Sequence, residues 1–214
     1  KILAEHPAEV SETEVRKVCD SFLGDYEQVP PMYSALKVNG KKLYELARAG
    51  KEVERKPRPV KILELEILEY RLPVVKMRVV CSKGTYIRTL CADIGKKLGC
   101  GGTMQSLRRT AVGRFTQEAA VTLGQLQQMK DEGRLEEAVL PVESMFLNCP
   151  VLHVTEENNK LLENGNIVSP EQTKEKSVYG PEQWVRLCRT DGSFVGIYVF
   201  EPERKWYKPV KMFL

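Results

Sequence analysis

The 214-residue sequence lacks a hydrophobic run long enough to cross a bilayer, which would require roughly 18–20 consecutive apolar residues. Charged residues such as Lys76 and Arg78 interrupt its longest apolar stretches. The N-terminus is polar from Glu5 onward, so no signal peptide is recognisable. We therefore expect a cytoplasmic protein that has no membrane partner.

Closely spaced metal ligands are missing as well. The six cysteines include no CxxC pair, and the two histidines, His6 and His153, lie far apart in the sequence. Structural zinc sites need paired ligands, and histidine-dependent catalytic arrangements need a histidine beside a nucleophile. We therefore expect no metal site, and we interpret the cysteines as small buried hydrophobic residues that stay reduced in a cytosol.

The common phosphate-binding loops are also absent. Glycines occur at positions 95, 99, 101 and 102, but neither the GxxxxGK[ST] nor the GxGxxG spacing is present. These glycines are typical of a helix C-terminus followed by a turn. The sequence therefore predicts no cofactor.

What the sequence does contain is positive charge in two blocks, although the net charge is only +4. Residues 37–61 hold nine basic and three acidic side chains, and residues 83–114 hold seven basic and one acidic, so each block has a net charge of +6. Residues 1–28, by contrast, hold three basic and seven acidic side chains. The two blocks indicate a polyanionic partner such as nucleic acid, although two solvated faces explain the charge alone equally well.

The N-terminal part predicts an amphipathic helix. Ser11 and Glu14 form a capping box, and apolar residues follow at helical spacing as far as Phe22. We expect Gly24 to cap the C-terminus of this helix.

The following segment predicts extended structure, a short helix and two strands. The prolines at 30–31 disfavour a helix, whereas residues 41–49 predict a short basic helix that ends at Gly50. Residues 61–69 alternate between apolar and acidic side chains, as a half-buried strand should, and residues 75–81 predict a second strand. The apolar side of the first strand is expected to comprise Leu63, Leu65 and Ile67.

Further along the chain, residues 87–98 predict a helix with one apolar face, and Gly99 is expected to end it. A strand near residues 111–116 and a helix from Thr122 follow. The composition changes at residues 141–150, and a mostly β unit then begins. Its expected strands lie at 151–154, 185–189, 194–200 and 208–213, its expected helix at 156–163, and its clearest hairpin turn at Asp191-Gly192. This pattern fits a larger α+β domain followed by a small β-barrel.

Residues 82–88 carry the most informative polar side chains. They lie where a predicted strand ends and a helix begins, so backbone N–H groups can face an anion. Tyr86 and Arg88 fall outside the apolar face of that helix, and core packing does not need them. Arg88 can bind a carboxylate or phosphate through two hydrogen bonds, and Tyr86 offers an aromatic face and a hydroxyl. Proteins hold unstacked nucleotides with basic and aromatic side chains of this kind. The alternative interpretation of residues 82–88 is a capped helix with a surface salt bridge.

Four blocks of the sequence are similar to signatures of the TruB family of tRNA pseudouridine synthases. They are residues 31–44 (PMYSALKVNGKKLY), 81–88 (CSKGTYIR), 98–102 (LGCGG) and 107–109 (LRR), and they keep the order and approximate spacing of that family. The tail resembles a PUA domain, a small RNA-binding barrel. Its cues are weaker: Gly165-Asn166, residues 191–196 and residues 208–211.

This resemblance implies an α+β fold with two domains. Residues 1–146 would form part of a pseudouridine synthase catalytic domain, with a mixed, mainly antiparallel sheet and helices, and residues 147–214 a PUA-like β-barrel. The implied reaction converts the T-loop uridine at position 55 of tRNA into pseudouridine without metal or redox cofactor. The implied partner is tRNA, bound at its T arm and, through the second domain, at its acceptor stem. The resemblance also implies a monomer for the full-length protein.

The resemblance also implies roles for individual residues. Arg88 would be catalytic by orienting the aspartate nucleophile. The residues implied to bind substrate are Tyr86, Leu107, Lys83, Arg108, Arg109, Tyr33 and Lys37. Among these, Tyr86 would contact the base, Leu107 would form a pocket wall, and Lys83, Arg108 and Arg109 would contact phosphates. Tyr33 and Lys37 belong to a loop that would lie against the T arm.

The family's catalytic aspartate, by the same resemblance, belongs to a Gly-x-x-Asp-Pro type motif. No aspartate in this sequence precedes a proline. We therefore expect the chain to lack the family's N-terminal segment, to leave a sheet edge uncovered, and to be inactive by itself. A non-catalytic RNA-binding or RNA-folding module is the alternative. A basic protein–protein interaction domain would explain neither residues 82–88 nor the tail.

Overall fold

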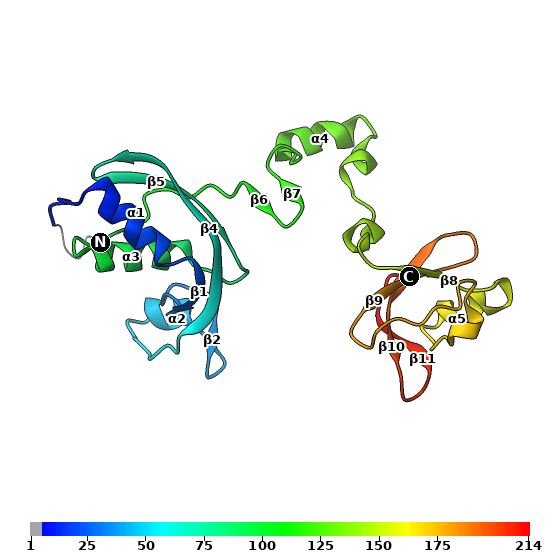
Figure 1. Cartoon of the computed structure of the whole chain (residues 1–214). Coiled ribbons are helices and arrows are strands. Elements are labelled where there is room, and N and C mark those ends of the chain that lie inside the picture. Colours follow the sequence, from blue (N-terminus) through cyan, green and yellow to red (C-terminus); the bar gives the residue numbers. More distant parts are fainter. Residues whose placement is uncertain (1–5) are drawn as a thin grey trace. The chain divides into compact units, whose positions relative to one another are not determined.

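The computed structural model describes residues 6–214. The chain divides into two compact units, Lys1–Thr110 and Ala111–Leu214, each of which carries its own sheet (Figure 1). Across the described residues, no helix combines the length and the apolar character that a membrane span requires. The mixture of helices with mainly antiparallel strands confirms the expected α+β class.

Helix α1 (Glu12–Asp20) begins where its capping box predicts. The Ser11 hydroxyl accepts a hydrogen bond from the Glu14 N–H at 3.3 Å, and the Glu14 carboxylate accepts one from the Ser11 N–H at 2.8 Å. The expected end of the helix at Gly24 is wrong. Ser21 caps the helix instead, and its hydroxyl donates to the Val18 carbonyl. Gly24, with φ +89°, is the first residue of a strand.

The first unit contains a three-stranded antiparallel sheet in the order β1 (Gly24–Gln28), β4 (Arg58–Arg71), β5 (Val74–Cys81). Helices α1 and α3 (Ile87–Leu98) lie beside it (Figure 1). Their apolar faces and that of β4 form a buried core that comprises Val15, Cys19, Phe22, Ile62, Ile67, Leu90 and Ile94. The sequence did not predict β1, because its short alternation of polar residues resembles a loop.

The long strand β4 departs from the expected alternation of inward and outward side chains. Ile62 is buried and Leu63 is 56% exposed, although Leu63 was expected on the inner face. The register against β5 shifts between Ile62 and Glu64, as at a β-bulge. Because a bulge adds one residue to the strand, the inward positions change from Val60 and Ile62 before it to Leu65 and Ile67 after it.

A small hairpin and helix connect β1 to β4. Strands β2 (Lys37–Val38) and β3 (Lys41–Lys42) pair across a turn in which Asn39 and Gly40 have φ values of +51° and +79°. Helix α2 (Leu43–Arg48) follows, two residues later than the expected start at residue 41.

Helix α3 ends at Gly99, which adopts the left-handed conformation with φ +82° and confirms the expected cap. Gly95 within the helix has a different role. The backbone of Gly101 and Gly102 lies so close that a Cβ atom at Gly95 would be 2.2 Å from the Gly101 carbonyl carbon. The turn after α3 is therefore packed directly on the helix backbone.

The second unit begins with a hairpin and a helix. Strands β6 (Ala111–Val112) and β7 (Phe115–Thr116) form a two-stranded hairpin where one strand was expected. Helix α4 (Leu123–Asp131) starts after Thr122 as expected, with a capping box to Gln125. Two 3₁₀ turns follow, η1 (Leu135–Ala138) and η2 (Val142–Phe146).

The remaining strands form a four-stranded sheet in the order β11 (Trp206–Met212), β10 (Phe194–Glu201), β9 (Trp184–Cys188), β8 (Val151–His153). Only β8 and β9 are parallel. The short helical elements η3 (Glu156–Asn158), α5 (Asn159–Glu163) and η4 (Pro170–Gln172) lie between β8 and β9 in the sequence. Strands β8 and β11 are the two edges of this sheet and are not paired with each other, so the barrel stays a prediction.

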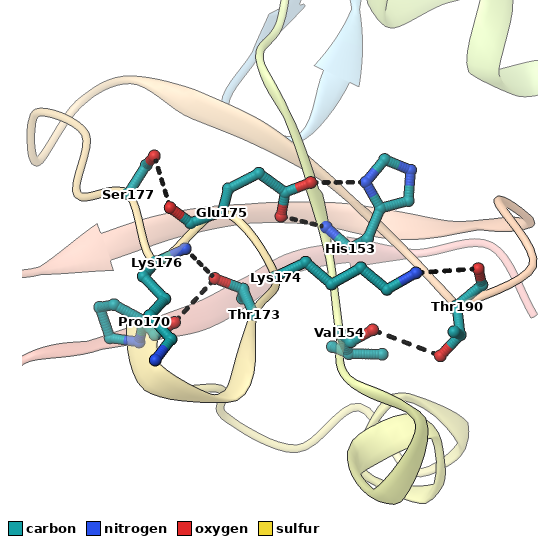
Figure 2. Close-up of polar contacts among 9 residues, drawn as sticks. All are labelled: His153, Val154, Pro170, Thr173, Lys174, Glu175, Lys176, Ser177 and Thr190. Carbon is teal, nitrogen blue, oxygen red and sulfur yellow. Dashed lines mark hydrogen bonds and ion pairs between the residues drawn. The ribbon is translucent and has the colours of Figure 1, made fainter.

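The loop after η4 is bonded to the start of this sheet (Figure 2). Thr173 is fully buried; its hydroxyl donates to the Pro170 carbonyl at 2.7 Å and accepts from the Lys176 N–H at 3.1 Å. Glu175 accepts from the backbone N–H of His153 at 2.8 Å and contacts the His153 Nδ1 at 2.7 Å (Figure 2). This loop is thereby fixed against β8.

Residues just before β8 also pack on the sheet. The Phe146 ring lies 5.6 Å from that of Phe213 and 6.0 Å from that of Phe194, measured between centroids. Glu143 pairs with the largely buried Arg186 at 2.8 Å. The expected domain boundary between residues 146 and 147 stays a prediction.

Candidate nucleic-acid interface

The candidate site lies at the connection between β5 and α3. The Ser82 N–H donates to the Lys61 carbonyl, and the Ser82 hydroxyl accepts from the Lys61 N–H, both at 2.8 Å. The Thr85 hydroxyl donates to the Ser82 carbonyl at 2.9 Å, and Gly84 adopts φ +85°. These bonds attach residues 82–85 to β4 and to one another.

Tyr86 is the N-cap residue of α3, and its own side chain makes no capping hydrogen bond. A residue from β1 holds the backbone of this N-cap residue instead. The Gln28 amide oxygen accepts from the Tyr86 N–H at 2.7 Å, and the amide nitrogen donates to the Tyr86 carbonyl at 3.1 Å. Gln28 is only 1% exposed, and the two bonds satisfy a side-chain amide whose burial would otherwise be costly.

Sequence reasoning missed Gln28. It stands two residues before the prolines at 30–31, at the start of a segment expected to be extended or looping, and its partner lies 58 residues away. A glutamine gives no sign in the sequence that it will be buried, so no local signal was available to identify it.

Arg88 and Tyr33, two of the expected site residues, are brought together. The Arg88 Nη2 donates to the Tyr33 backbone carbonyl at 2.8 Å, and both residues are exposed. This bond attaches the loop after β1 to the first turn of α3. Tyr33 is 59% exposed, and Tyr86 is half-buried.

Cations continue along the hairpin of the same loop. Lys37 stands opposite Lys42 in the β2–β3 pair. The Lys42 ammonium and the Arg48 guanidinium lie 5.4 and 5.3 Å from the centre of the Tyr44 ring. Cation–π contacts of this length orient charges without neutralising them. The hairpin therefore presents a positively charged, aromatic surface.

The other expected contacts are exposed but not joined to this group. Lys83 is exposed in the turn before Tyr86. Leu107, Arg108 and Arg109 lie in an irregular segment, where Leu107 is 58% exposed. Within residues 6–214, no hydrogen bond links these three residues to Tyr86 or Arg88. The close packing of the turn at 101–102 on α3 anchors the start of their segment.

The aspartates of the chain have other partners or are exposed. Asp93 in α3 accepts a short hydrogen bond from the Tyr26 hydroxyl of β1. Burial, together with this bond, raises the pKa of Tyr26. Asp131 accepts from Gln127 at 2.8 Å, and hydrogen bonds from Ser193 lower the pKa of Asp191. The described residues contain no cluster of three or more His, Cys, Asp or Glu side chains that could hold a metal.

A separate shallow cavity of about 540 Å³ lies in the second unit. Arg204 and Lys205 contribute positive charge, and Trp206 contributes an aromatic side chain. The Arg204 guanidinium lies 5.3 Å from the Trp206 ring centre. Asn166, Ser169 and Gln172 add polar groups to the lining.

Two family profiles match consecutive stretches of the sequence. The profile described as "TruB family pseudouridylate synthase (N terminal domain)" matches residues 1–87, and "tRNA pseudouridylate synthase B C-terminal domain" matches residues 88–147. The chain is 45% identical over 205 residues to tRNA pseudouridine synthase B of Lachnoclostridium phytofermentans, covering 91% of this chain and 67% of that protein. It is 40% identical over 200 residues to tRNA pseudouridine synthase B of Pseudomonas aeruginosa, covering 92% and 64%.

Solved structures give a consistent likeness in fold. A crystal structure of a Cbf5–Nop10–Gar1 complex matches with a TM-score of 0.71 and 23% identity, over 98% of this chain and 64% of that one. A structure of an H/ACA RNP bound to a substrate RNA containing 2′-deoxyuridine matches with a TM-score of 0.70 and 21% identity, over 98% and 63%. The chain thus spans about two thirds of the length of these proteins.

Proposed function

Because the chain belongs to the TruB family of pseudouridylate synthases, we propose that it is part of an enzyme that converts a tRNA uridine into pseudouridine. We further propose that the uridine is the T-loop residue at position 55. The observation that carries the proposal is the Arg88–Tyr33 hydrogen bond beside Tyr86, because it joins two separate family blocks at one exposed site. The names of the relatives, tRNA pseudouridine synthase B, support pseudouridine formation in tRNA.

In this proposal, the uridine leaves its stack and its base lies against Tyr86. The reaction breaks the N1–C1′ bond and forms a C5–C1′ bond, while C5 loses a proton and N1 gains one, so no oxidant or reductant is consumed. A carboxylate acts as nucleophile or base towards the sugar. The Arg88 guanidinium orients that carboxylate through paired hydrogen bonds.

The remaining expected residues hold the RNA around this point. We assign phosphate contacts to Lys37, Lys83, Arg108 and Arg109, all of which are exposed. Leu107 forms a wall of the base pocket. Tyr33, which is exposed and whose backbone carbonyl accepts from Arg88, contacts the T arm.

The second domain, which we place at residues 147–214, is proposed to be a PUA-like barrel that contacts the acceptor stem. The cavity lined by Arg204, Lys205 and Trp206 supports this role, since cations beside an aromatic ring suit RNA. Deleting this domain should weaken binding of whole tRNA more than binding of a T-arm hairpin. Equal weakening of both RNAs would contradict the assignment. We place the protein in the cytoplasm, as a monomer with tRNA as its partner.

The catalytic proposal is tested by incubating the 214-residue chain with unmodified tRNA and measuring pseudouridine by mass-shift labelling. We expect no product from the chain by itself, because Asp93 is engaged by Tyr26 and no other aspartate contacts the start of α3 in the described residues. Adding a family segment that carries the Asp-Pro motif should restore product. Product from the chain alone would require the nucleophile to be sought among its own carboxylates.

A non-catalytic RNA-binding module is the second candidate function. The observation that favours it is the same lack of an aspartate positioned at Arg88. It predicts tight T-arm binding but no pseudouridine after the family segment is added. The two functions therefore differ in a single measurement.

A further inference from the structure

Helix α3 differs from the other capped helices in how its first residue is held. The hydroxyls of Ser11 in α1 and Thr122 in α4 each accept a hydrogen bond from the backbone N–H three residues later. Tyr86 makes no such bond, and Gln28 from β1 holds both its N–H and its carbonyl instead. The start of α3 is therefore positioned by another strand.

The loop that follows the same strand contacts Arg88. The chain leaves Gln28 and reaches Tyr33 five residues later, where the carbonyl accepts the Arg88 guanidinium. Residues 28–33 are thus bonded to residues 86–88 at both ends. A second link from β1 to α3, the hydrogen bond from Tyr26 to Asp93, lies two residues before Gln28. In the sequence, Gln28 therefore lies between the residues that make the Tyr26–Asp93 and Tyr33–Arg88 contacts.

We propose that Gln28 is a positioning residue of the RNA site: its amide fixes the Tyr86 backbone and thereby the directions of the Tyr86 ring and the Arg88 side chain. The inference rests on the proposed function for its RNA consequence. Gln28 itself is buried and does not touch the substrate.

Two substitutions separate the hydrogen bonds from the shape of the side chain. Gln28→Leu keeps a similar volume but removes the acceptor and the donor. Gln28→Glu keeps the acceptor; its carboxyl can donate to the Tyr86 carbonyl when protonated and repels that carbonyl when ionised. The Gln28→Glu variant should therefore resemble the parent chain at low pH and lose the hydrogen bond to the Tyr86 carbonyl at high pH. Because the Tyr26–Asp93 hydrogen bond lies nearby, each variant is compared with the parent at the same pH.

The RNA measurement uses a T-arm hairpin with a fluorescent uridine analogue at the T-loop target position. Anisotropy reports affinity, and quenching reports stacking of the base on Tyr86. We expect Gln28→Leu to bind within about threefold of the parent, because the phosphate contacts lie elsewhere, while losing most of the quenching. Gln28→Glu should keep the quenching at low pH and lose it at high pH. Gln127→Leu, on the exposed face of α4, is the matched control and should change neither.

Amide hydrogen exchange of Tyr86 provides a second readout that needs no RNA. We expect exchange of its N–H to accelerate at least about tenfold in Gln28→Leu, because the N–H loses its acceptor, and to stay close to the parent rate in Gln28→Glu, which keeps that acceptor. Parent-like exchange and quenching in both variants would overturn the proposal, and so would equal losses of affinity and quenching, which indicate a general folding role. If the parent chain binds no RNA, the proposed function fails, and parent-like Tyr86 exchange in Gln28→Leu would still refute the Gln28 inference separately.

Discussion

At the scale of single residues, Arg88 shows why charge and geometry must be separated. Its guanidinium already uses one donor on the Tyr33 carbonyl and has others in the same plane. A lysine would keep the positive charge but would provide no planar fork for a carboxylate.

We therefore predict that Arg88→Lys keeps RNA affinity within about threefold but lowers turnover at least about 100-fold when the family's aspartate segment is supplied. Binding and single-turnover rates measured on the same preparation would check this. Arg78→Lys is the control, because Arg78 forms only an exposed ion pair with Glu66 on the sheet. Equal losses of affinity and rate would make Arg88 a simple phosphate contact.

Glu175 provides a prediction about pH. Burial pushes its pKa upward, but hydrogen bonds from the His153 ring and backbone outweigh this and leave the pKa below its ordinary value of 4.5. A depressed carboxyl pKa stabilises the fold above the unfolded pKa, and this contribution disappears as pH falls through the folded value. Glu175→Gln should therefore destabilise the second unit by about 1 kcal/mol at pH 7 and by much less at pH 3. Tryptophan fluorescence measures this unit alone, since Trp184 and Trp206 are the only tryptophans.

At the scale of secondary-structure elements, the contact between α3 and the turn after it determines where Leu107 to Arg109 begin. No side chain fits between Gly95 and the backbone of Gly101. A methyl group there would push the turn away from the helix, and the basic segment would move with it.

Gly95→Ala is predicted to destabilise the first unit by at least about 2 kcal/mol and to weaken RNA binding. The control is Gly124→Ala, in helix α4, where a Cβ would meet nothing within 4 Å. That change should stabilise its helix by about 0.5–1 kcal/mol. Far-UV circular dichroism follows both units, and tryptophan fluorescence identifies the second. Unchanged melting of Gly95→Ala would contradict the packing argument.

The segment before β8 provides a second test at this scale. Phe146 lies in a cluster with Phe194 and Phe213, while its neighbour Leu147 is 59% exposed. Phe146→Ala should cost the second unit about 1–2 kcal/mol, and Leu147→Ala less than about 0.5 kcal/mol. A loss for Phe146→Ala as small as that expected for Leu147→Ala would mean that the Phe146 cluster contributes little to the sheet's stability. The result also tests whether a domain that starts at residue 147 omits part of its own packing.

At the scale of the whole chain, the two basic blocks determine how salt affects RNA binding. Each has a net charge of +6, although the complete chain has only +4. If about four to six phosphates are neutralised, the log–log slope of T-arm affinity against salt should lie near −3 to −5. Titrations of a labelled hairpin at several salt concentrations would measure it. A flat response would exclude nucleic acid as the partner of these blocks.

The sequence alone determined features that depend on near neighbours. The capping boxes at Ser11 and Thr122 join residues three positions apart, and the left-handed cap at Gly99 needs only a residue without a Cβ. The family blocks gave the expected site residues in the same way, because short motifs can be recognised without a fold. None of these features requires knowledge of distant packing.

Only the tertiary structure decided the contacts between distant residues. It bonded Gln28 to Tyr86 and Arg88 to Tyr33 across more than 50 positions, engaged Asp93 with Tyr26, and turned Leu63 outward at a bulge. The physical reason is that a buried amide or a shifted strand register is stabilised by partners that folding brings together. Composition and spacing carry no record of such partners, so the residue that positions the site was visible only in the fold.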